Sequence, residues 1–228
     1  MQAVILAAGR GTRMGELTEE IPKPMLMVSG KTLIEHKLDA LPGVIDEVII
    51  IIGHKGDVVS NHFGDSYGNK KITYIIQDVL DGTAGALWRA KDILRGGFIV
   101  MMGDDLYSAQ DIATSAKALD WLLVVAKTEH MSAGGCVIVD ALDRIISIEE
   151  GSHGGAAGRI STNLFRLDTR LFDYPMVPKS VGSNEYGLPQ TVLASSKLSG
   201  VPFFATMAHS WIQITSSEDL DKADKLLS

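Results

Sequence analysis

Along the first half of the chain, short apolar runs alternate with segments whose apolar residues recur every three to four positions. Runs rich in Val and Ile predict buried strands. These runs are Ala3–Ala7, Glu47–Ile52, Ile72–Ile76, Phe98–Met102 and Leu122–Ala126. The segments of helical period are Thr32–Leu41, Asp57–Phe63, Thr83–Leu94 and Ala109–Leu119. Because strands and helices alternate, we expect βαβ units and a mainly parallel sheet.

The pattern changes after about residue 130, where apolar runs follow one another with little helix between them. Runs at Val137–Val139, Ile145–Ile148 and Ile160–Leu167 predict hairpins, or a small antiparallel annex to the sheet. The composition of Gly151–Gly158 predicts a flexible loop. The chain then closes with predicted elements at Tyr186–Lys197 (helix), Phe203–Met207 and Ser210–Ile214 (strands), and Ser217–Leu227 (helix). The predicted fold class is α/β, with three Rossmann-like layers around a mainly parallel central sheet.

Composition favours a soluble globular protein. A chain of 228 residues exposes roughly 10,000 Å² when folded and about 35,000 Å² when unfolded, which is enough burial for one domain with its own core. The net charge of −7 supplies no basic field for nucleic acid. The sequence has no run of about 20 apolar residues and no basic signal region, so we expect a cytoplasmic protein that contacts no membrane. The single cysteine, Cys136, excludes an internal disulfide and a thiolate metal cluster.

Candidate chemistry begins in the glycine-rich loop after the first predicted strand, which spans Leu6 to Arg13. Ligands of α/β sheets bind beyond the carboxyl ends of strands, and small residues let backbone N–H groups approach a phosphate. The dinucleotide fingerprint GxGxxG is excluded, because Met14 stands where its third glycine should be. A Walker loop is excluded too, because Met25 stands where that motif needs glycine ahead of Gly30-Lys31-Thr32.

A longer pattern does fit a known family. It consists of Leu6-Ala-Ala-Gly-x-Gly-Thr-Arg13, Pro22-Lys23-Pro24-Met25-Leu26, Gly30-Lys31 and Leu33-Ile34-Glu35-His36. This pattern resembles the sugar-phosphate nucleotidylyltransferase family. The resemblance implies Mg²⁺-dependent transfer of a nucleotidyl group from a nucleoside triphosphate to a sugar 1-phosphate, with release of pyrophosphate. It implies catalytic cations at Arg13 and Lys23, and nucleotide-binding positions at Leu6, Ala8, Gly9, Gly11 and Thr12.

The resemblance extends along most of the chain. Gln77, followed by Gly82-Thr83, resembles the segment of this family that binds the base, and a Gln amide suits the imide edge of uracil or thymine. We therefore expect UTP or dTTP as the substrate. Asp104, after the strand that ends at Met102, corresponds to the Mg²⁺ ligand, and we expect Asp105 to cap the loop.

The predicted sugar-phosphate site rests on the resemblance as well. Gly135, Glu149 and Asn163 match the family's sugar-binding positions. Two departures stand out. Gln213 occupies the second metal-ligand position, where the family usually has Asp, and Glu150 replaces a lysine near the sugar phosphate.

Nearby residues bear on these departures. The missing cation could come from Arg159 or Lys179. At Glu185, which precedes a predicted helix, we favour helix capping over a functional role.

Three hypotheses follow. The leading one is a transferase that makes a UDP- or dTDP-sugar. The second is the same fold with another base, or with an acceptor such as phosphocholine or an alcohol phosphate, which Glu150 and Gln213 motivate. The third is a catalytically weak nucleotide-binding regulatory module.

The expected organisation is a single domain over residues 1–228, with a nucleotide-binding half (1–127) and a sugar-phosphate-binding half (128–228). We expect no β-helix domain after it. The expected partners are the two small-molecule substrates, and a homo-oligomer is possible without any sequence signal for it.

Overall fold

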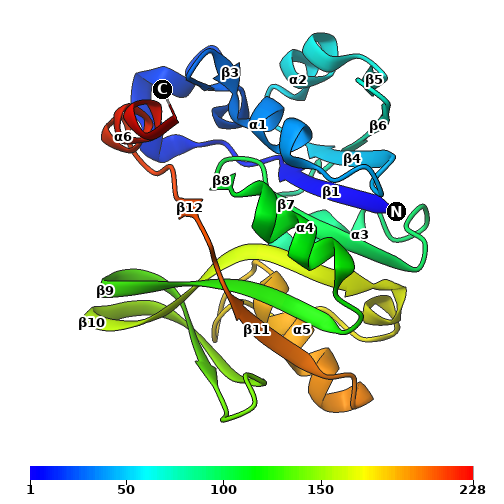
Figure 1. Ribbon diagram of the computed structural model, residues 1–228, viewed down its shortest axis with the longest axis vertical. Helices are drawn as coiled ribbons and strands as arrows, with labels where there is room; N and C mark the ends of the chain where they lie inside the picture. The colour runs from blue at the N-terminus through cyan, green and yellow to red at the C-terminus, as the bar shows by residue number, and fades with distance from the viewer. Residues whose placement is uncertain (228) are drawn as a thin grey trace.

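The computed structural model describes residues 1–227, apart from the side chains of Arg13, Glu16, Ser132 and Ala133. Its centre is an eight-stranded sheet with the order β11-β9-β10-β7-β1-β4-β6-β5 (Figure 1). The parallel part contains β1 (Gln2–Ala7), β4 (Glu47–Ile52), β6 (Lys70–Ile76) and β7 (Gly97–Met102). The short edge strand β5 (Ser66–Tyr67) is antiparallel to β6.

Helices cover both faces of this sheet because its buried strands send alternate side chains to opposite faces. On one face, Ala3 and Ile5 pack in the same cluster as residues of the helices α1 (Leu33–Ala40), α2 (Gly56–Phe63) and α4 (Ala109–Lys117). On the other face, Val4 and Leu6 pack with α3 (Thr83–Trp88) and α5 (Leu188–Ser199). The predicted three-layer α/β fold class is confirmed.

The second half of the chain completes the same sheet. The long strands β9 (Trp121–Val139) and β10 (Ile145–Asp168) pair antiparallel, and β11 (Phe203–Met207) adds in parallel to β9. β10 also pairs antiparallel with β7, so it lies between the last strand of the βαβ part and β9. The line between the two predicted halves, at residue 127, therefore falls inside β9.

The prediction of a flexible loop at Gly151–Gly158 was wrong. This segment is part of β10, where Ser152 pairs with Ala133 and Ala156 with Met131. The register shifts between these two pairs, at Gly154 and Gly155, which have positive φ angles of 62° and 80°. Ladder hydrogen bonds need only backbone groups, so a small-residue composition does not prevent pairing, and the glycines supply the conformations of an irregular bulge.

Two small sheets and a helix close the molecule beside α1. β12 (Trp211–Ile212) pairs antiparallel with β8 (Leu106–Tyr107), and β2 (Met27–Val28) pairs with β3 (Lys31–Thr32). The helix α6 (Ser217–Leu227) packs against β2. The 3₁₀ segments η1 (Thr12–Thr18), η2 (Lys23–Met25) and η3 (Thr169–Asp173) complete the description.

Helix boundaries differ from the prediction by one or two residues at several helices and by six residues at the end of α3. α3 ends at Trp88 rather than Leu94, because the following residues form turns in which Lys91 N–H donates to Trp88 O. α5 begins at Leu188, with Pro189 in its first turn, where a missing N–H group is tolerated. Among residues 1–227, none of the helices combines the length and apolar character that crossing a bilayer requires.

Candidate functional site

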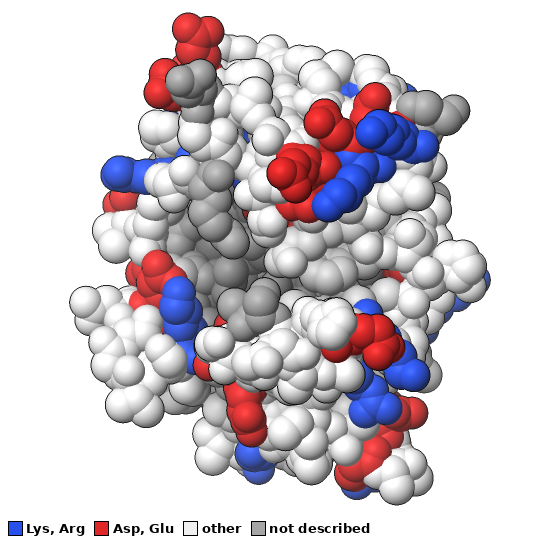
Figure 2. Space-filling model, turned by 90° about the vertical axis from the view of Figure 1, so that its left-hand side faces the viewer, with Lys and Arg blue, Asp and Glu red and all other residues white. Residues whose placement is uncertain are grey.

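Two adjoining cavities lie where β1 and β7 end. The larger has a volume of about 480 Å³ and the smaller about 190 Å³. Leu6, Gly9, Thr12 and Met102 line both, so the cavities form one continuous site. Figure 2 views the molecule from the side at which β1 ends, and the surface there is hollowed. On this face, Lys and Arg side chains lie beside Asp and Glu rather than in one basic field.

Most of the residues predicted from sequence meet at this site. The larger cavity is lined by the predicted residues Leu6, Ala8, Gly9, Thr12, Gln77, Gly82, Thr83 and Asn163. The smaller cavity is lined by Gly11, Lys23 and Asp104. The side chain of the predicted catalytic Arg13 lies outside the described part of the structure. Gly135, Glu149 and Gln213 line neither cavity.

The loop after β1 presents free donors to both cavities. In the described part of the chain, no hydrogen bond uses the backbone N–H of Gly9, Arg10 or Gly11. Gly11 has a φ of +66°, and a Cβ built on it would lie 2.9 Å from Lys23 Cβ. Only glycine therefore lets Lys23 pack directly against the loop. Free N–H groups next to a fixed ammonium are suited to binding phosphate oxygens.

Lys23 and Asp104 form an ion pair inside the smaller cavity. Pro22 and Pro24 flank Lys23, and Pro24 lies in the first turn of η2, which fixes the backbone there. Lys23 is 5% exposed, and its Nζ donates to Asp104 Oδ2 over 2.5 Å. The pair joins the loop after β1 to the end of β7.

A second group of charges lies buried beneath this pair. Lys37, on α1, is 2% exposed, and its Nζ donates to the carbonyl oxygens of Leu33 (2.9 Å) and Gly103 (3.0 Å). Asp105 is also buried, and its Oδ2 accepts a hydrogen bond from Trp211 Nε1 at 3.2 Å rather than capping the loop. Burial lowers the pKa of Lys37 and raises the pKa of Asp105, while the opposite charge of each partner counteracts both shifts.

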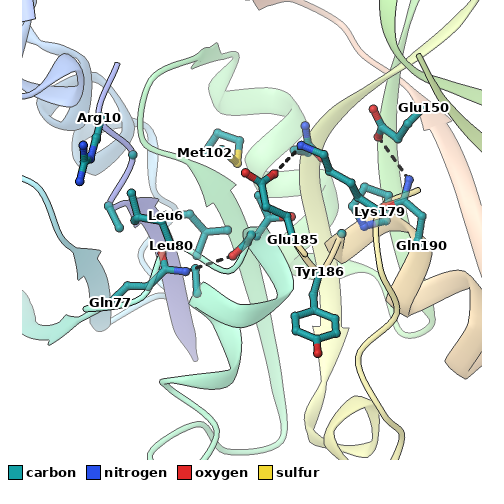
Figure 3. A pocket seen from close by; sticks show the side chains of 18 of the residues that line it. Leu6, Arg10, Gln77, Leu80, Met102, Glu150, Lys179, Glu185, Tyr186 and Gln190 are labelled. Carbon is teal, nitrogen blue, oxygen red and sulfur yellow. Dashed lines mark hydrogen bonds and ion pairs between the residues drawn. The ribbon is translucent and has the colours of Figure 1, made fainter. Parts of the chain in front are cut away.

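Gln77 is held by hydrogen bonds at the end of β6. Its Nε2 donates to Asp81 Oδ1 at 2.9 Å and to Gly82 O at 3.2 Å. Figure 3 marks one hydrogen bond of this side chain. Both amide protons are therefore used within the protein, and the oxygen Oε1 is the group left for a ligand.

The segment from Gln77 to Ala84 packs against a second segment, around Tyr186, that is distant in the sequence. Tyr186 N–H donates to Asp81 O, and Ala84 N–H donates to Tyr186 O. A Cβ at Gly82 would lie 2.4 Å from Tyr186 O, and Gly82 has a φ of +97°. Both the close approach and the backbone conformation therefore require glycine at this position.

The far end of the larger cavity is strongly polar. Gln190 Nε2 donates to Glu150 Oε1 at 3.2 Å, and Lys179 Nζ forms an ion pair with Glu185 Oε2 (Figure 3). Helix capping by Glu185 was a wrong expectation, since the N-cap of α5 is Gly187 and no side chain caps it. Glu185 instead lines the cavity together with Lys179.

The remaining predicted residues lie near the cavities. Glu150 faces the larger cavity and its neighbour Glu149 does not, because consecutive residues of a strand point to opposite faces. Gly135 pairs with Glu150, and a Cβ there would lie 2.9 Å from Glu150 Oε1, so Gly135 leaves room for that carboxylate. Gln213 is exposed and directly follows Ile212, whose strand partner is Leu106, close in sequence to Asp104.

Sequence reasoning missed several lining residues. Met102 lies between the two sides of the larger cavity in Figure 3, and Leu80 lines it as well. The signal for Met102 was its position as the last residue of a strand that neighbours β1, since ligands bind beyond such ends. Pro189 carries no comparable signal, because the docking of the 186–188 segment brings it to the cavity.

Comparison with known proteins places this geometry in a family. Residues 2–186 match the nucleotidyl transferase family. The bifunctional protein GlmU of Methanococcus maripaludis (strain DSM 14266) is 37% identical over 221 residues, which cover 92% of this chain and 52% of that protein. The UTP–glucose-1-phosphate uridylyltransferase AglF of Haloferax volcanii is 26% identical and covers 100% of this chain and 96% of its own length.

A solved structure supports the fold. A putative glucose-1-phosphate thymidylyltransferase from Bacillus anthracis superposes with a TM-score of 0.82 at 23% identity, over 99% of this chain and 94% of that one. The chain spans about half the length of the bifunctional relatives it matches, 41% in one case and 52% in another. The family predicted from the motifs is confirmed by the match over residues 2–186. The chain belongs to the nucleotidyl transferase family.

Proposed function

We propose that the protein transfers a nucleotidyl group from a nucleoside triphosphate, UTP or dTTP by preference, to a sugar 1-phosphate. A phosphate oxygen of the sugar 1-phosphate attacks the α-phosphorus, an NDP-sugar forms and pyrophosphate leaves. The observation that carries this proposal is the continuity of two cavities, one lined by Gln77 and the other by the Lys23–Asp104 pair. The full-length match to AglF, which is named for UTP and glucose 1-phosphate, supports it.

The hydrogen bonds of Gln77 support uracil or thymine over cytosine. Its amide protons are engaged by Asp81 and Gly82, so the side chain offers a ligand an acceptor. Uracil and thymine carry an N–H at the centre of their imide edge, whereas the corresponding ring nitrogen of cytosine is an acceptor. Gln77 Oε1 accepts from this N–H in the proposed complex.

The triphosphate occupies the smaller cavity in this proposal. The free N–H groups of Gly9 to Gly11 bind its oxygens, and Lys23 stabilises charge on the α-phosphate. We assign Arg13 to the β- and γ-phosphates, because a guanidinium can grip two oxygens at once. The acceptor phosphate needs no general base, since its second pKa is near 6 and it is largely dianionic at pH 7.

The site also suits Mg²⁺ that arrives with the nucleotide. Among the described residues, no group of three or more His, Cys, Asp and Glu side chains is placed to hold a metal ion. Mg²⁺ typically takes one or two carboxylates together with substrate phosphates rather than a cage made by the protein. Asp104 would supply the carboxylate and Gln213 an amide oxygen. When bound, Mg²⁺ neutralises phosphate charge.

The acceptor end favours a polyhydroxylated molecule over a quaternary ammonium compound such as phosphocholine. Glu150, Glu185, Gln190 and Asn163 offer acceptors and donors that match hydroxyl groups. A quaternary ammonium group is typically bound in a cage of aromatic rings. Among the described lining residues, Tyr186 is the single aromatic one, and its ring points away from the cavity (Figure 3).

Pyrophosphate release tests the proposal across UTP, dTTP, GTP and CTP, each with a set of sugar 1-phosphates and with phosphocholine, with and without Mg²⁺. We expect release with UTP or dTTP and a sugar 1-phosphate, and loss of release without Mg²⁺. Lys23→Met and Asp104→Asn should each lower kcat/KM by about 10²-fold or more, the typical cost of removing a group that stabilises developing charge.

Lys31→Met is the matched control. Lys31 Nζ lies 2.5 Å from Asp39 Oδ2, the same separation as in the Lys23–Asp104 pair, but this pair is exposed and lines neither cavity. The kcat/KM of the Lys31→Met variant should equal that of the wild type. A preference for GTP or CTP would contradict the base assignment. Nucleotide binding without any release would favour the regulatory-module hypothesis over the transferase.

A further inference from the structure

On the proposed function, the acceptor end of the larger cavity must bind an anion although it is itself lined by anionic side chains. It must hold a phosphate dianion, yet it contains the carboxylates of Glu150 and Glu185. Carboxylates repel a phosphate dianion that is placed beside them. The other cations that line the two cavities in the described part of the chain are Lys23, which pairs with Asp104, and Arg10, which lies beside Leu6 on the opposite side of Figure 3. Lys179 is the cation at the acceptor end.

Lys179 is held in place by the backbone around it. Its N–H donates to Glu185 O at 2.9 Å, Pro178 forms a bridge with Tyr186, and Gly187 N–H donates to Val177 O at 3.1 Å. Residues 177–187 therefore form a hairpin-like loop, called here the 177–187 loop. Because Tyr186 is hydrogen-bonded to Asp81 and Ala84, this loop sits at a fixed position relative to the segment proposed to bind the base.

The present partner of Lys179 is one it can exchange. The side chains of Lys179 and Glu185 are 47% and 49% exposed. Ion pairs between exposed side chains contribute little to stability, because water screens them and both side chains lose freedom. A phosphate dianion carries two negative charges and a carboxylate one, so the charge-assisted contact of the ammonium with the phosphate is the stronger. Transfer of the ammonium from Glu185 to a phosphate is therefore favourable.

Arg159, the other cation considered for this role, is placed differently. It lies on β10, pairs with Lys127 of β9, and lines neither cavity. The structure therefore distinguishes the two candidates, because Lys179 lines the larger cavity and Arg159 does not.

We propose that Lys179 binds the phosphate of the acceptor, exchanging its ion pair with Glu185 for the incoming dianion. Glu185 is thereby released to accept hydrogen bonds from hydroxyl groups of the same substrate. Lys179 thus supplies the positive charge that this chain lacks at Glu150, where the family pattern has a lysine. Lys179 is a substrate-binding residue in this scheme, and the 177–187 loop couples the acceptor site to the nucleotide site.

Steady-state kinetics of Lys179→Met test the proposal, with KM measured separately for the acceptor and for the nucleotide. We expect KM for the sugar 1-phosphate to rise about 10- to 100-fold, the usual effect of losing a hydrogen bond to a charged group. KM for the nucleoside triphosphate should stay within about 2-fold. Lys179→Arg should recover most of the acceptor affinity, because it restores the positive charge. Glu185→Gln should leave binding of the phosphate intact, tested with inorganic phosphate as a competitive inhibitor.

Arg159→Met is the matched control, and its KM values should equal those of the wild type. Equal acceptor KM values for Lys179→Met and the wild type would overturn the proposal, as would a rise in acceptor KM for Arg159→Met of the same size. A wild-type protein that releases no pyrophosphate with any pair of substrates would instead refute the proposed function itself. Thermal denaturation of each variant separates these outcomes from loss of folding, which we do not expect at a half-exposed lysine.

Discussion

Lys37 places a positive charge where no solvent reaches it. The side chain lies on the buried face of α1, four residues after Leu33 and three after Ile34, so helical spacing alone directs it toward the sheet. Its hydrogen bond to Gly103 O links α1 to the turn that carries Asp104 and Asp105. Lys37 thus supports the segment on which the proposed metal ligand lies, without lining either cavity.

Replacing Lys37 by Met should be destabilising. The variant removes the positive charge that acts on the buried carboxyl of Asp105, and it leaves the carbonyl oxygens of Leu33 and Gly103 without the Lys37 ammonium as a donor. Leaving a buried acceptor without its donor costs about 1–3 kcal/mol. Urea denaturation at pH 7 measures the change in the free energy of unfolding.

The double variant Lys37→Met/Asp105→Asn serves as the control. It removes both charges and should recover much of the lost stability. If the double variant were as unstable as the single one, the loss would come from packing rather than from charge.

At the residue scale, sequence reasoning succeeded where a motif is local. Gly11, Lys23 and Asp104 meet in one cavity as the motif spacing predicts, because each lies within a few residues of a strand end. It failed where a side chain's role depends on partners far along the chain. The pairing of Glu185 with Lys179 and the bond between Asp105 and Trp211 come from tertiary contacts that no local pattern encodes.

At the scale of elements, the segment that contains Asp81 and Ala84 and the segment that contains Tyr186 behave as one unit. The turn that begins α3 and the segment that precedes α5 share hydrogen bonds through Asp81, Ala84 and Tyr186. Thr83 Oγ1 also accepts from Leu188 N–H at 2.9 Å. The strands β1, β4, β6 and β7 were well predicted because buried strands have continuous apolar runs, whereas the two-residue strands β2, β3, β5 and β8 were not predicted. The extent of β10 was not, because its glycine-rich middle is paired by backbone groups alone.

Gly82→Ala should disrupt this unit. The new Cβ would lie 2.4 Å from Tyr186 O, so the two segments must separate, and the alanine would also have to adopt a φ of +97°. We expect a loss of stability above the cost of the backbone conformation, about 1–3 kcal/mol, and an increase in KM for the nucleotide. Thermal denaturation and steady-state kinetics measure the two effects.

Gly64→Ala provides the comparison. Gly64 has φ and ψ angles of 61° and −143°, against 97° and −178° at Gly82, but no atom lies within 4 Å of the position of its Cβ. It should show the cost of the backbone conformation alone and an unchanged KM. Identical behaviour of the two variants would argue against the docking of the two segments.

At the scale of the molecule, both halves of the chain share one sheet and one pair of cores. The cluster on one face includes Val4 and Phe98 from the first half together with Phe165 and Phe203 from the second. The cluster on the other face joins Ile5 with Leu164 in the same way. The order of the chain suggested two consecutive halves, and β9, β10 and β11 do lie together at one end of the sheet, but the two halves bury residues in the same clusters on both of its faces.

We therefore expect a single cooperative unfolding transition. Trp88 on α3 and Trp121 on β9 report on different parts of the sheet, and both belong to or pack against the same cluster. Urea unfolding followed by the fluorescence of single-tryptophan variants should superpose with unfolding followed by far-ultraviolet circular dichroism. Separate midpoints for the two probes would show that α3 and β9 unfold in different steps.

The place of β10 in the sheet also determines the order in which the molecule can be completed during synthesis. β7 ends at Met102, but the residues of β10 that pair with it are Phe165 to Asp168. At about 5–20 residues per second, roughly sixty residues take about 3–12 s to be made. During that time one edge of β7 has no strand beside it, and such an edge is a template for pairing with other chains. The nascent chain, rather than the finished protein, is thus the form most prone to aggregation and most dependent on chaperones.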